Sequence, residues 1–451
     1  MKKLLISCWL MLSLAAHAQQ TFPVNGPRDV TPQFFAFTNA TLYVDYQTKI
    51  ENGLLLIKDG KVVYAGGAKA IPQGATVINA KGKFIYPAFI DLYASYGLQL
   101  SSENKKSEQE TRQFVSAKKG AYNWNEAIRA EVHAANYFVT DDKKAAQFRE
   151  SGFGLVLSGV QDGICRGSST LVLTANGAEQ EMVLVQKAAT GFSFSKGSSR
   201  QSYPSSLMGS VALLRQTYYD ALWYQKQTKE TNLTLESFNQ LKTLPSIFAA
   251  DTKLSILRAD KIGDEFGVQY VIKTAGDEYQ RLEEVKATNA TLIVPVNFPK
   301  ACDVEDPFDA AYVSTTDLKH WEMAPFNARL VNEKGIRFAL TSDGCENAKQ
   351  FLQNVKKAVA CGLPETDALK ALTATPAALL KVEQQVGSLK AGLIANFLIT
   401  DAPVFSNDAV LLQTWVKGKS YDVTAAKAPV LLGKYNIVHP ELTKYVLHAK
   451  K

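Results

Sequence analysis

The sequence predicts an α/β protein in which a (β/α)8 barrel is inserted into a small β-sandwich domain built from both ends of the chain. Three observations favour this fold. The central part alternates short apolar runs with amphipathic segments, turn-rich β segments flank it, and 451 residues are enough for one large and one smaller domain. The predicted limits are 84–386 for the barrel, and 24–83 together with 387–438 for the sandwich.

The N-terminus has the pattern of a secretory signal peptide. Lys2 and Lys3 precede an apolar run, and "AHA" before Gln19 has the small-residue form at which signal peptidase cleaves. We expect residues 1–18 to be removed after Ala18, and the mature protein to be periplasmic or secreted. No later segment approaches the ~20 consecutive apolar residues of a membrane span, so we expect none.

Charge and cysteine content exclude several classes of protein. The formal net charge is +7, and the lysines are scattered among acids, as in "SSENKKSEQETR" (101–112). This is typical of a solvated mixed-charge surface and not of a nucleic-acid-binding stripe. Beyond the signal segment the chain has no C-x-x-C pair, so neither a zinc motif nor a disulfide framework is indicated. One disulfide stays open, without a pairing, among Cys165, Cys302, Cys345 and Cys361.

The sandwich is predicted from β segments near the two ends of the chain. "NGLLLIKDGKVVYAGG" (52–67) joins two apolar runs through "KDGK", which is a hairpin signal. After residue 387, "GSLKAGLIANFLITD" and "LLQTWVKGKSYDV" show the same style around a "KGK" turn. Two such segments at opposite ends of the chain predict one discontinuous β domain.

The barrel is predicted from apolar, β-branched runs of the kind that form strands buried on both faces. These runs lie at 152–160, 246–251, 268–276, 290–298 and 336–344. Helices are predicted over 205–227, where apolar residues recur at i, i+3, i+4 and i+7, and over 347–362, which ends at a glycine. Two polar, glycine- and serine-rich stretches, 159–170 and 191–206, are predicted to be loops at the end of the barrel where ligands bind. The first of them contains Arg166, which we expect near that end.

Three stretches resemble, in order, parts of the metal-dependent amidohydrolase superfamily. "GKFIYPAFIDLYASYG" (82–97) is similar to its first barrel strand, "FALTSDG" (338–344) to its last, and residues 369–399 to its return into the β-sandwich. The resemblance covers about residues 34–425 and is nearest to the imidazolonepropionase-like branch of exported Bacteroidetes-type proteins. It implies a hydrolase of carbon–nitrogen bonds that uses a divalent metal such as zinc, with Asp343 as the metal-binding, catalytic aspartate.

The histidines that hold the metal in that family are replaced in this chain. Tyr93 and Ser95 stand at the H-x-H positions, Lys273 lies in the fifth-strand region, and Asn297 is nearest to the sixth-strand ligand. A phenol and a serine hydroxyl are poor ligands for zinc or iron at neutral pH, and a catalytic site needs about three protein ligands. We therefore expect no bound metal, since Asp343 is the only ligand left. We also expect Asp343 to face Lys273.

Two functions remain open. The first is a pseudoenzyme without a cofactor, which binds a small polar ligand through Tyr93, Ser95, Arg166, Lys273 and Asn297, or docks a catalytic amidohydrolase homologue or module. The alternative is a metal-dependent hydrolase of imidazolonepropionase-like type that acts on cyclic amides or dipeptides. A serine hydrolase is disfavoured, because "SFSK" (193–196) fits S-x-x-K but no K-T-G follows.

Overall fold

The computed structural model describes residues 34–100, 113–226, 229–424, 433–436 and 446–449. The predicted signal peptide (1–18) and the start of the predicted sandwich (24–33) lie outside the described residues. No helix in the described part of the chain is long and apolar enough to cross a membrane. The four cysteines at 165, 302, 345 and 361 are free.

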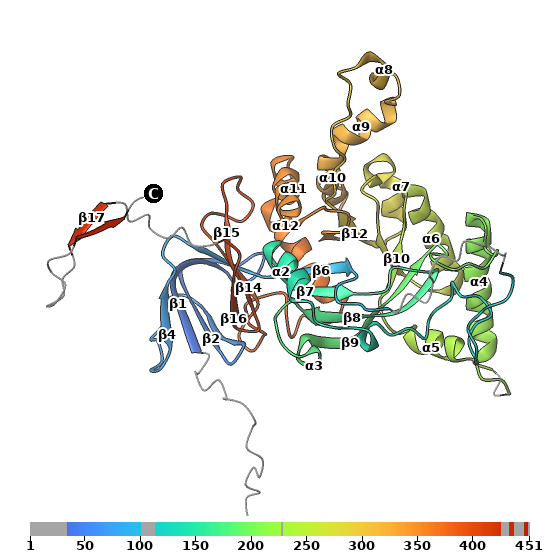
Figure 1. Ribbon diagram of the computed structural model, residues 1–451, viewed down its shortest axis with the longest axis horizontal. Helices are drawn as coiled ribbons and strands as arrows, with labels where there is room; N and C mark the ends of the chain where they lie inside the picture. Colours follow the sequence, from blue (N-terminus) through green and yellow to red (C-terminus); the bar gives the residue numbers. More distant parts are fainter. Residues whose placement is uncertain (1–33, 101–112, 227–228, 425–432, 437–445, 450–451) are drawn as a thin grey trace, which may run out of the picture. The chain divides into compact units, whose positions relative to one another are not determined.

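One sheet, here called the outer sheet, combines strands from both ends of the chain (Figure 1). β5 (Phe84–Pro87) pairs antiparallel with β14 (Phe397–Thr400), and this pairing joins the N-terminal strands to the C-terminal ones. The sheet reaches past residue 83, where the sequence places the start of the barrel. Its strands run in the order β16-β15-β14-β5-β1-β2-β3, with β4 beside β1. The other strands of this sheet are β1 (Phe34–Tyr43), β2 (Lys49–Lys58), β3 (Lys61–Gly66), β4 (Thr76–Asn79), β15 (Leu411–Val416) and β16 (Lys419–Asp422).

The core of the outer sheet is aromatic. Phe397 stacks on Trp415 with ring centroids 5.2 Å apart, and Phe37 meets the Trp415 ring edge-on at 5.1 Å. Phe37 and Phe397 are fully buried. Residues from both ends of the chain therefore share one hydrophobic cluster, which holds the discontinuous segments together.

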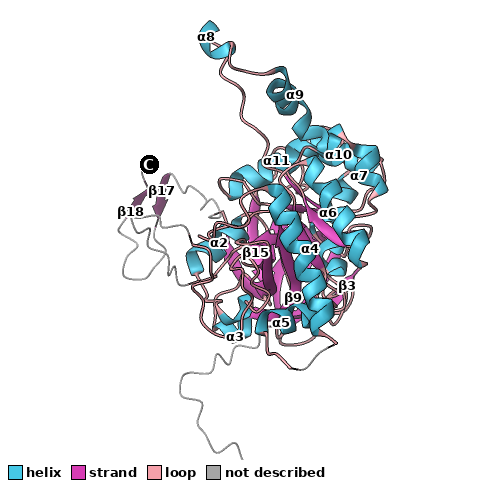
Figure 2. Cartoon of the chain, turned by 90° about the vertical axis from the view of Figure 1, so that its right-hand side faces the viewer, coloured by secondary structure: helices cyan, strands magenta, loops and turns pink. Residues whose placement is uncertain are grey.

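A second, eight-stranded sheet, here called the central sheet, fills the middle of the chain. Helices α4 (Leu207–Tyr224), α5 (Leu233–Leu241) and α6 (Lys253–Phe266) lie over its strands in Figure 2. Its strand order follows the sequence: β6 (Phe89–Ala94), β7 (Phe153–Ser158), β8 (Cys165–Leu173), β9 (Val183–Ser193), β10 (Ser246–Ala249), β11 (Tyr270–Lys273), β12 (Thr291–Pro295) and β13 (Phe338–Thr341).

The direction of β8 departs from the predicted (β/α)8 barrel, in which all strands are parallel. β8 runs antiparallel to both β7 and β9, whereas the remaining neighbours in the sheet pair in parallel. Only residues 159–164 separate β7 from β8, and a parallel crossover needs roughly a dozen residues or more. The prediction that 159–170 is all loop is thus wrong from Cys165 onward, where β8 begins.

The first and last strands of the central sheet are joined through side chains. Asp91 on β6 is fully buried and accepts hydrogen bonds from Thr341 Oγ1 (2.6 Å) and from the backbone N–H (3.1 Å) and hydroxyl of Ser342. We call Asp91, Thr341 and Ser342 the seam. In the described part of the chain no backbone ladder joins β6 to β13, so this hydrogen-bonded carboxylate links the two sheet edges.

The helices follow the patterns of their sequences. α4 (Leu207–Tyr224) starts after Ser206, and α11 (Ala348–Ala360) starts after Asn347, whose side chain accepts from the Gln350 N–H at 2.9 Å. The other helices and short strands are η1 (Ala134–Asn136), α2 (Asp142–Glu150), α3 (Glu179–Met182), α5 (Leu233–Leu241), α6 (Lys253–Phe266), η2 (Glu278–Gln280), α7 (Leu282–Ala287), α8 (Pro307–Ala310), α9 (Thr315–Met323), η3 (Ala324–Phe326), α10 (Asn327–Glu333), α12 (Glu365–Leu372), α13 (Ala374–Leu379), β17 (Gly433–Asn436) and β18 (Val446–Ala449).

Candidate functional site

The C-terminal ends of the parallel strands lie along one edge of the central sheet, which we call the mouth. The reversed strand β8 begins at this same edge, because Cys165 pairs with Phe192 next to the end of β9. Arg166, the second residue of β8, is therefore carried to the mouth. In a parallel strand the same residue would lie at the opposite edge.

Arg166 is buried at the mouth beside Tyr93. Its side chain is 7% exposed, Nη1 donates to the Tyr93 hydroxyl at 2.8 Å, and Nε donates to the Gly163 carbonyl at 3.0 Å. Among the described residues no carboxylate pairs with this guanidinium. A buried arginine without an acidic partner is unusual, because burying a charge is costly unless it is paired.

Lys273, at the end of β11, is the second cation beside Tyr93. Its ammonium lies 5.1 Å from the centre of the Tyr93 ring and forms an ion pair with Asp343 Oδ2. The side chains of Lys273 and Asp343 are 16% and 26% exposed, so solvent still reaches the pair. We call Tyr93, Arg166, Lys273 and Asp343 the mouth cluster; it contains two cations, one carboxylate and one phenol.

Asn297 and Ser95 relate differently to the mouth cluster. Asn297 lies against Gly344, next to Asp343: a Cβ on Gly344, whose φ is +80°, would come within 2.2 Å of Asn297 Nδ2. Ser95 is exposed and lies beyond β6, which ends at Ala94 after a break in register. In a continuous strand, Tyr93 and Ser95 would point to the same face, which is what the sequence predicted. Because β6 ends at Ala94, Ser95 is outside the strand and this rule does not place it beside Tyr93.

The space beneath the mouth cluster is almost filled. A cavity of about 20 Å³ lies behind Tyr93 and Arg166, lined also by Gln161, Ser169 and Ile247. This is close to the ~10–15 Å³ that a single water needs. A ligand at this site would therefore lie over the mouth and not inside the sheet.

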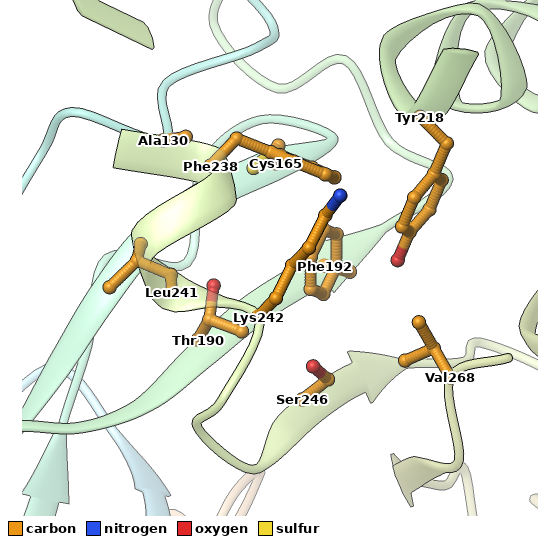
Figure 3. Close-up of a pocket in the computed structure, with 10 residues that line it drawn as sticks. All are labelled: Ala130, Cys165, Thr190, Phe192, Tyr218, Phe238, Leu241, Lys242, Ser246 and Val268. Carbon is orange, nitrogen blue, oxygen red and sulfur yellow. The ribbon is translucent and has the colours of Figure 1, made fainter. Parts of the chain in front are cut away.

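A second small cavity lies away from the mouth, between the sheet and α4 and α5 (Figure 3). It also measures about 20 Å³, and aromatic and aliphatic side chains such as Phe192, Tyr218 and Phe238 form most of its walls. Lys242 reaches across it, with its ammonium 5.8 Å from the Phe238 ring centre. Its lining runs along the strands, from Ser246 at the start of β10 to Phe192 near the end of β9, on the side that α4 and α5 cover, so the cavity belongs to the helix–sheet packing.

Two buried carboxylates near the strand ends escaped the sequence-based search. Burial raises the pKa of Asp91, although the hydrogen bonds from Ser342 and Thr341 act to lower it. Glu278, just after β11, is also fully buried; burial raises its pKa, and its carboxylate accepts from Asn327 Nδ2 and the Gly276 N–H. A lone acid within an apolar run, as in "FIDL", is the signal that could have identified Asp91.

The donor set at the mouth does not fit a divalent metal. The one carboxylate of the mouth cluster is already paired with the Lys273 cation, and the other groups at the predicted ligand positions are a phenol, an exposed serine and an amide. No group of three or more His, Cys, Asp or Glu side chains that could hold an ion occurs in the described parts of the chain.

His133 and His320 make other bonds. His133 Nδ1 lies 2.9 Å from Ser168 Oγ, and burial lowers its pKa. His320 Nδ1 lies 3.2 Å from the Tyr279 hydroxyl. These bonds lead to Ser168 and Tyr279, which are not residues of the mouth cluster.

Comparison with known proteins supports an amidohydrolase-type fold. Residues 324–421 match the amidohydrolase family. An amidohydrolase from Thermotoga maritima superposes over 86% of this chain and 99% of its own, with 21% identity and a TM-score of 0.67. A Xaa-Pro dipeptidase crystallised with methionine in its active site covers 86% of this chain and 100% of its own, at 12% identity and a TM-score of 0.51. No curated protein sequence matches the chain. At these identities the structural likeness shows the fold alone.

Proposed function

We propose that the chain is a non-catalytic member of the amidohydrolase fold, and that its mouth cluster binds a small ligand through a carboxylate group. The observation that carries this proposal is Arg166, a buried guanidinium with no acidic partner among the described residues. A guanidinium has five N–H donors, and the described structure supplies acceptors for two of them. A ligand oxyanion would satisfy the others.

The rest of the mouth cluster supports the same ligand class. Lys273 lies over the Tyr93 ring and Arg166 donates to its hydroxyl, so two cations lie beside this phenol. Arginine forks match the planar geometry of a carboxylate, which can accept two parallel N–H bonds. Asp343 can accept a hydrogen bond from a polar group of the ligand, because its own side chain is partly exposed to solvent.

The cluster has no evident nucleophile or base for hydrolysis. Burial raises the pKa of Cys345, the thiol near Asp343, to about 12, so this thiol is not a reactive thiolate at neutral pH. Lys273 is ion-paired with Asp343, the carboxylate that would have to ligate a metal. The metal-dependent hydrolase of imidazolonepropionase-like type is the alternative that the experiment must reject. A catalytic homologue as partner stays a prediction from the sequence.

The test is calorimetric titration of the protein with a panel of dipeptides, N-acyl amino acids and their amide-capped counterparts. We expect a subset of the free carboxylates to bind and the capped forms to bind at least about tenfold more weakly, a loss of ~1.4 kcal/mol. Arg166→Gln should cause a similar loss. The matched control is Arg215→Gln, which removes a surface guanidinium paired with Glu265 and should leave binding unchanged.

A hydrolysis assay on the same panel, with zinc or manganese supplied, distinguishes the two functions. Turnover above about 1 per second, in the range of ordinary enzymes, that is abolished by Asp343→Ala would establish a working hydrolase and reject the proposal. Failure of every carboxylate to bind would also reject it.

A further inference from the structure

A segment that follows β12 exposes aromatic and acidic side chains together. We call residues 301–314, which contain α8, the acidic segment. It carries Asp303, Glu305, Asp306 and Asp309 and has no lysine or arginine, and the ion pairs of the described residues include none of these four acids. α8 has no buried residue, and Phe308 and Tyr312 are 82% and 88% exposed. Large exposed aromatic side chains of this kind mark interaction sites.

The acidic segment has a defined local structure. Asp306 caps α8 by accepting from the Phe308 N–H at 2.7 Å, and Pro307 occupies the first helical position. Phe308 lies in α8, and Tyr312 lies in the turn just beyond it, where its N–H donates to the Asp309 carbonyl at 3.0 Å. The following helix, α9, begins with a capping box at Ser314. Both aromatic rings are exposed, and burying both against a partner would remove roughly 300 Å² or more from water.

A groove of opposite charge lies between α11 and the end of the outer sheet. Its volume is about 720 Å³, within the range of roughly 300–1,000 Å³ that is typical of binding pockets. Leu352, Val410 and Leu411 contribute apolar surface, and Lys349, Lys356 and Lys357 line it with positive charge. We call this the basic groove.

Two of the three lysines of the basic groove are exposed, and one of them, Lys357, also lies 6.0 Å from the centre of the Phe298 ring. Lys349 and Lys357 are exposed, and no described ion pair involves either of them. Lys356 is half-buried and donates to the Ala409 carbonyl at 2.7 Å, which fixes its ammonium at the groove wall. Glu150 is the acid among the lining residues, so lysines outnumber acids there.

We propose that the basic groove binds the acidic segment of a second copy of this chain, with Phe308 and Tyr312 over the apolar floor and the carboxylates beside the lysines. The acidic segment and the basic groove are different surfaces of one chain. The contact is therefore heterologous, and each bound copy still offers a free segment and a free groove. Because the interface is small and charged, its dissociation constant should be on the order of 10–100 µM and should rise with salt.

The first experiment is sedimentation velocity of the full chain from about 1 to 100 µM. We expect the average mass to rise with concentration and to fall when salt is raised from 0.1 to 0.5 M. A segment variant, Phe308→Asp with Tyr312→Asp, and a groove variant, Lys349→Glu with Lys357→Glu, should each weaken self-association at least about tenfold. A matched charge reversal on α6, Arg258→Glu with Lys261→Glu, should have no effect. Carboxylate binding at the mouth should be unchanged in all of them.

Mixing the two variants gives the sharper test. The segment variant keeps an intact groove and the groove variant keeps an intact segment, so together they form one productive contact. We expect an equimolar mixture to form a heterodimer and to stop at two copies, while each variant alone stays monomeric. A wild type that is monomeric throughout, or a mixture that does not associate, would overturn the proposal.

Discussion

The seam and the mouth cluster each centre on one carboxylate, and the two carboxylates have opposite environments. Asp91 is fully buried and accepts hydrogen bonds from neutral hydroxyl and amide groups of Thr341 and Ser342. Asp343, the next residue after Ser342, is 26% exposed and pairs with the Lys273 cation. The first carboxylate joins two strands, whereas the second retains a partner that solvent and ligands can reach. Burial and the kind of donor, and not the residue type, separate a structural acid from a binding acid.

This comparison of the two carboxylates predicts that substitutions in the seam lower the free energy of unfolding more than substitutions in the mouth cluster. Asp91→Ala should lower the free energy of unfolding by about 3 kcal/mol, because it leaves buried donors of Thr341 and Ser342 without an acceptor. Urea denaturation followed by circular dichroism measures this loss. Ser342→Ala is the control for a single lost side-chain bond to Asp91 and should cost about 1 kcal/mol. If Asp91→Ala costs less than Ser342→Ala, then Asp91 does not hold the seam.

The seam should also give stability a pH dependence. Burial raises the pKa of Asp91 above its ordinary value of about 3.9. Between that value and the raised pKa the folded chain binds more protons than the unfolded chain, so this carboxyl contributes stability that is present at low pH and lost as pH rises through the folded pKa. The unfolding free energy of wild type, relative to Asp91→Asn, should therefore increase as pH falls from 7 to 4. A relative decrease would contradict this sign.

The mouth cluster should matter little for stability. Asp343→Ala removes a partly exposed ion pair, and such pairs contribute about 1 kcal/mol or less. The expected loss in urea denaturation is therefore within that limit, although ligand affinity should change, since the charge of the mouth becomes more positive. A loss as large as that of Asp91→Ala would show that the two carboxylates do not differ as described.

Metal addition should have the smallest effect. Because Lys273 already neutralises Asp343, zinc, iron or manganese should remain below about half an equivalent after dialysis, and zinc should not raise the thermal midpoint. Elemental analysis and thermal scans with zinc or with EDTA measure both quantities. A full equivalent that is lost in Asp343→Ala would identify the mouth as a metal site.

The sequence predicted those parts of the molecule that depend on local pattern. β10 and β13 fall within the predicted apolar runs, because strands buried on both faces contain few polar residues. Lys273 and Asp343 face each other as predicted, since both follow strands that end at the same edge. The direction of β8 was missed, although the shortness of the 159–164 connection carries that information. The partners of Asp91 lie some 250 residues away along the chain, and no local pattern reveals them.

The reversal of β8 also bears on the order in which the chain folds. β7, β8 and β9 form antiparallel pairs between neighbours in sequence, and such pairs close short loops at small entropic cost. The seam closes a loop of about 250 residues, so we expect it to form after the transition state. Mutations at the seam should then speed unfolding and leave the folding rate nearly unchanged, whereas mutations in the β7–β9 meander should slow folding.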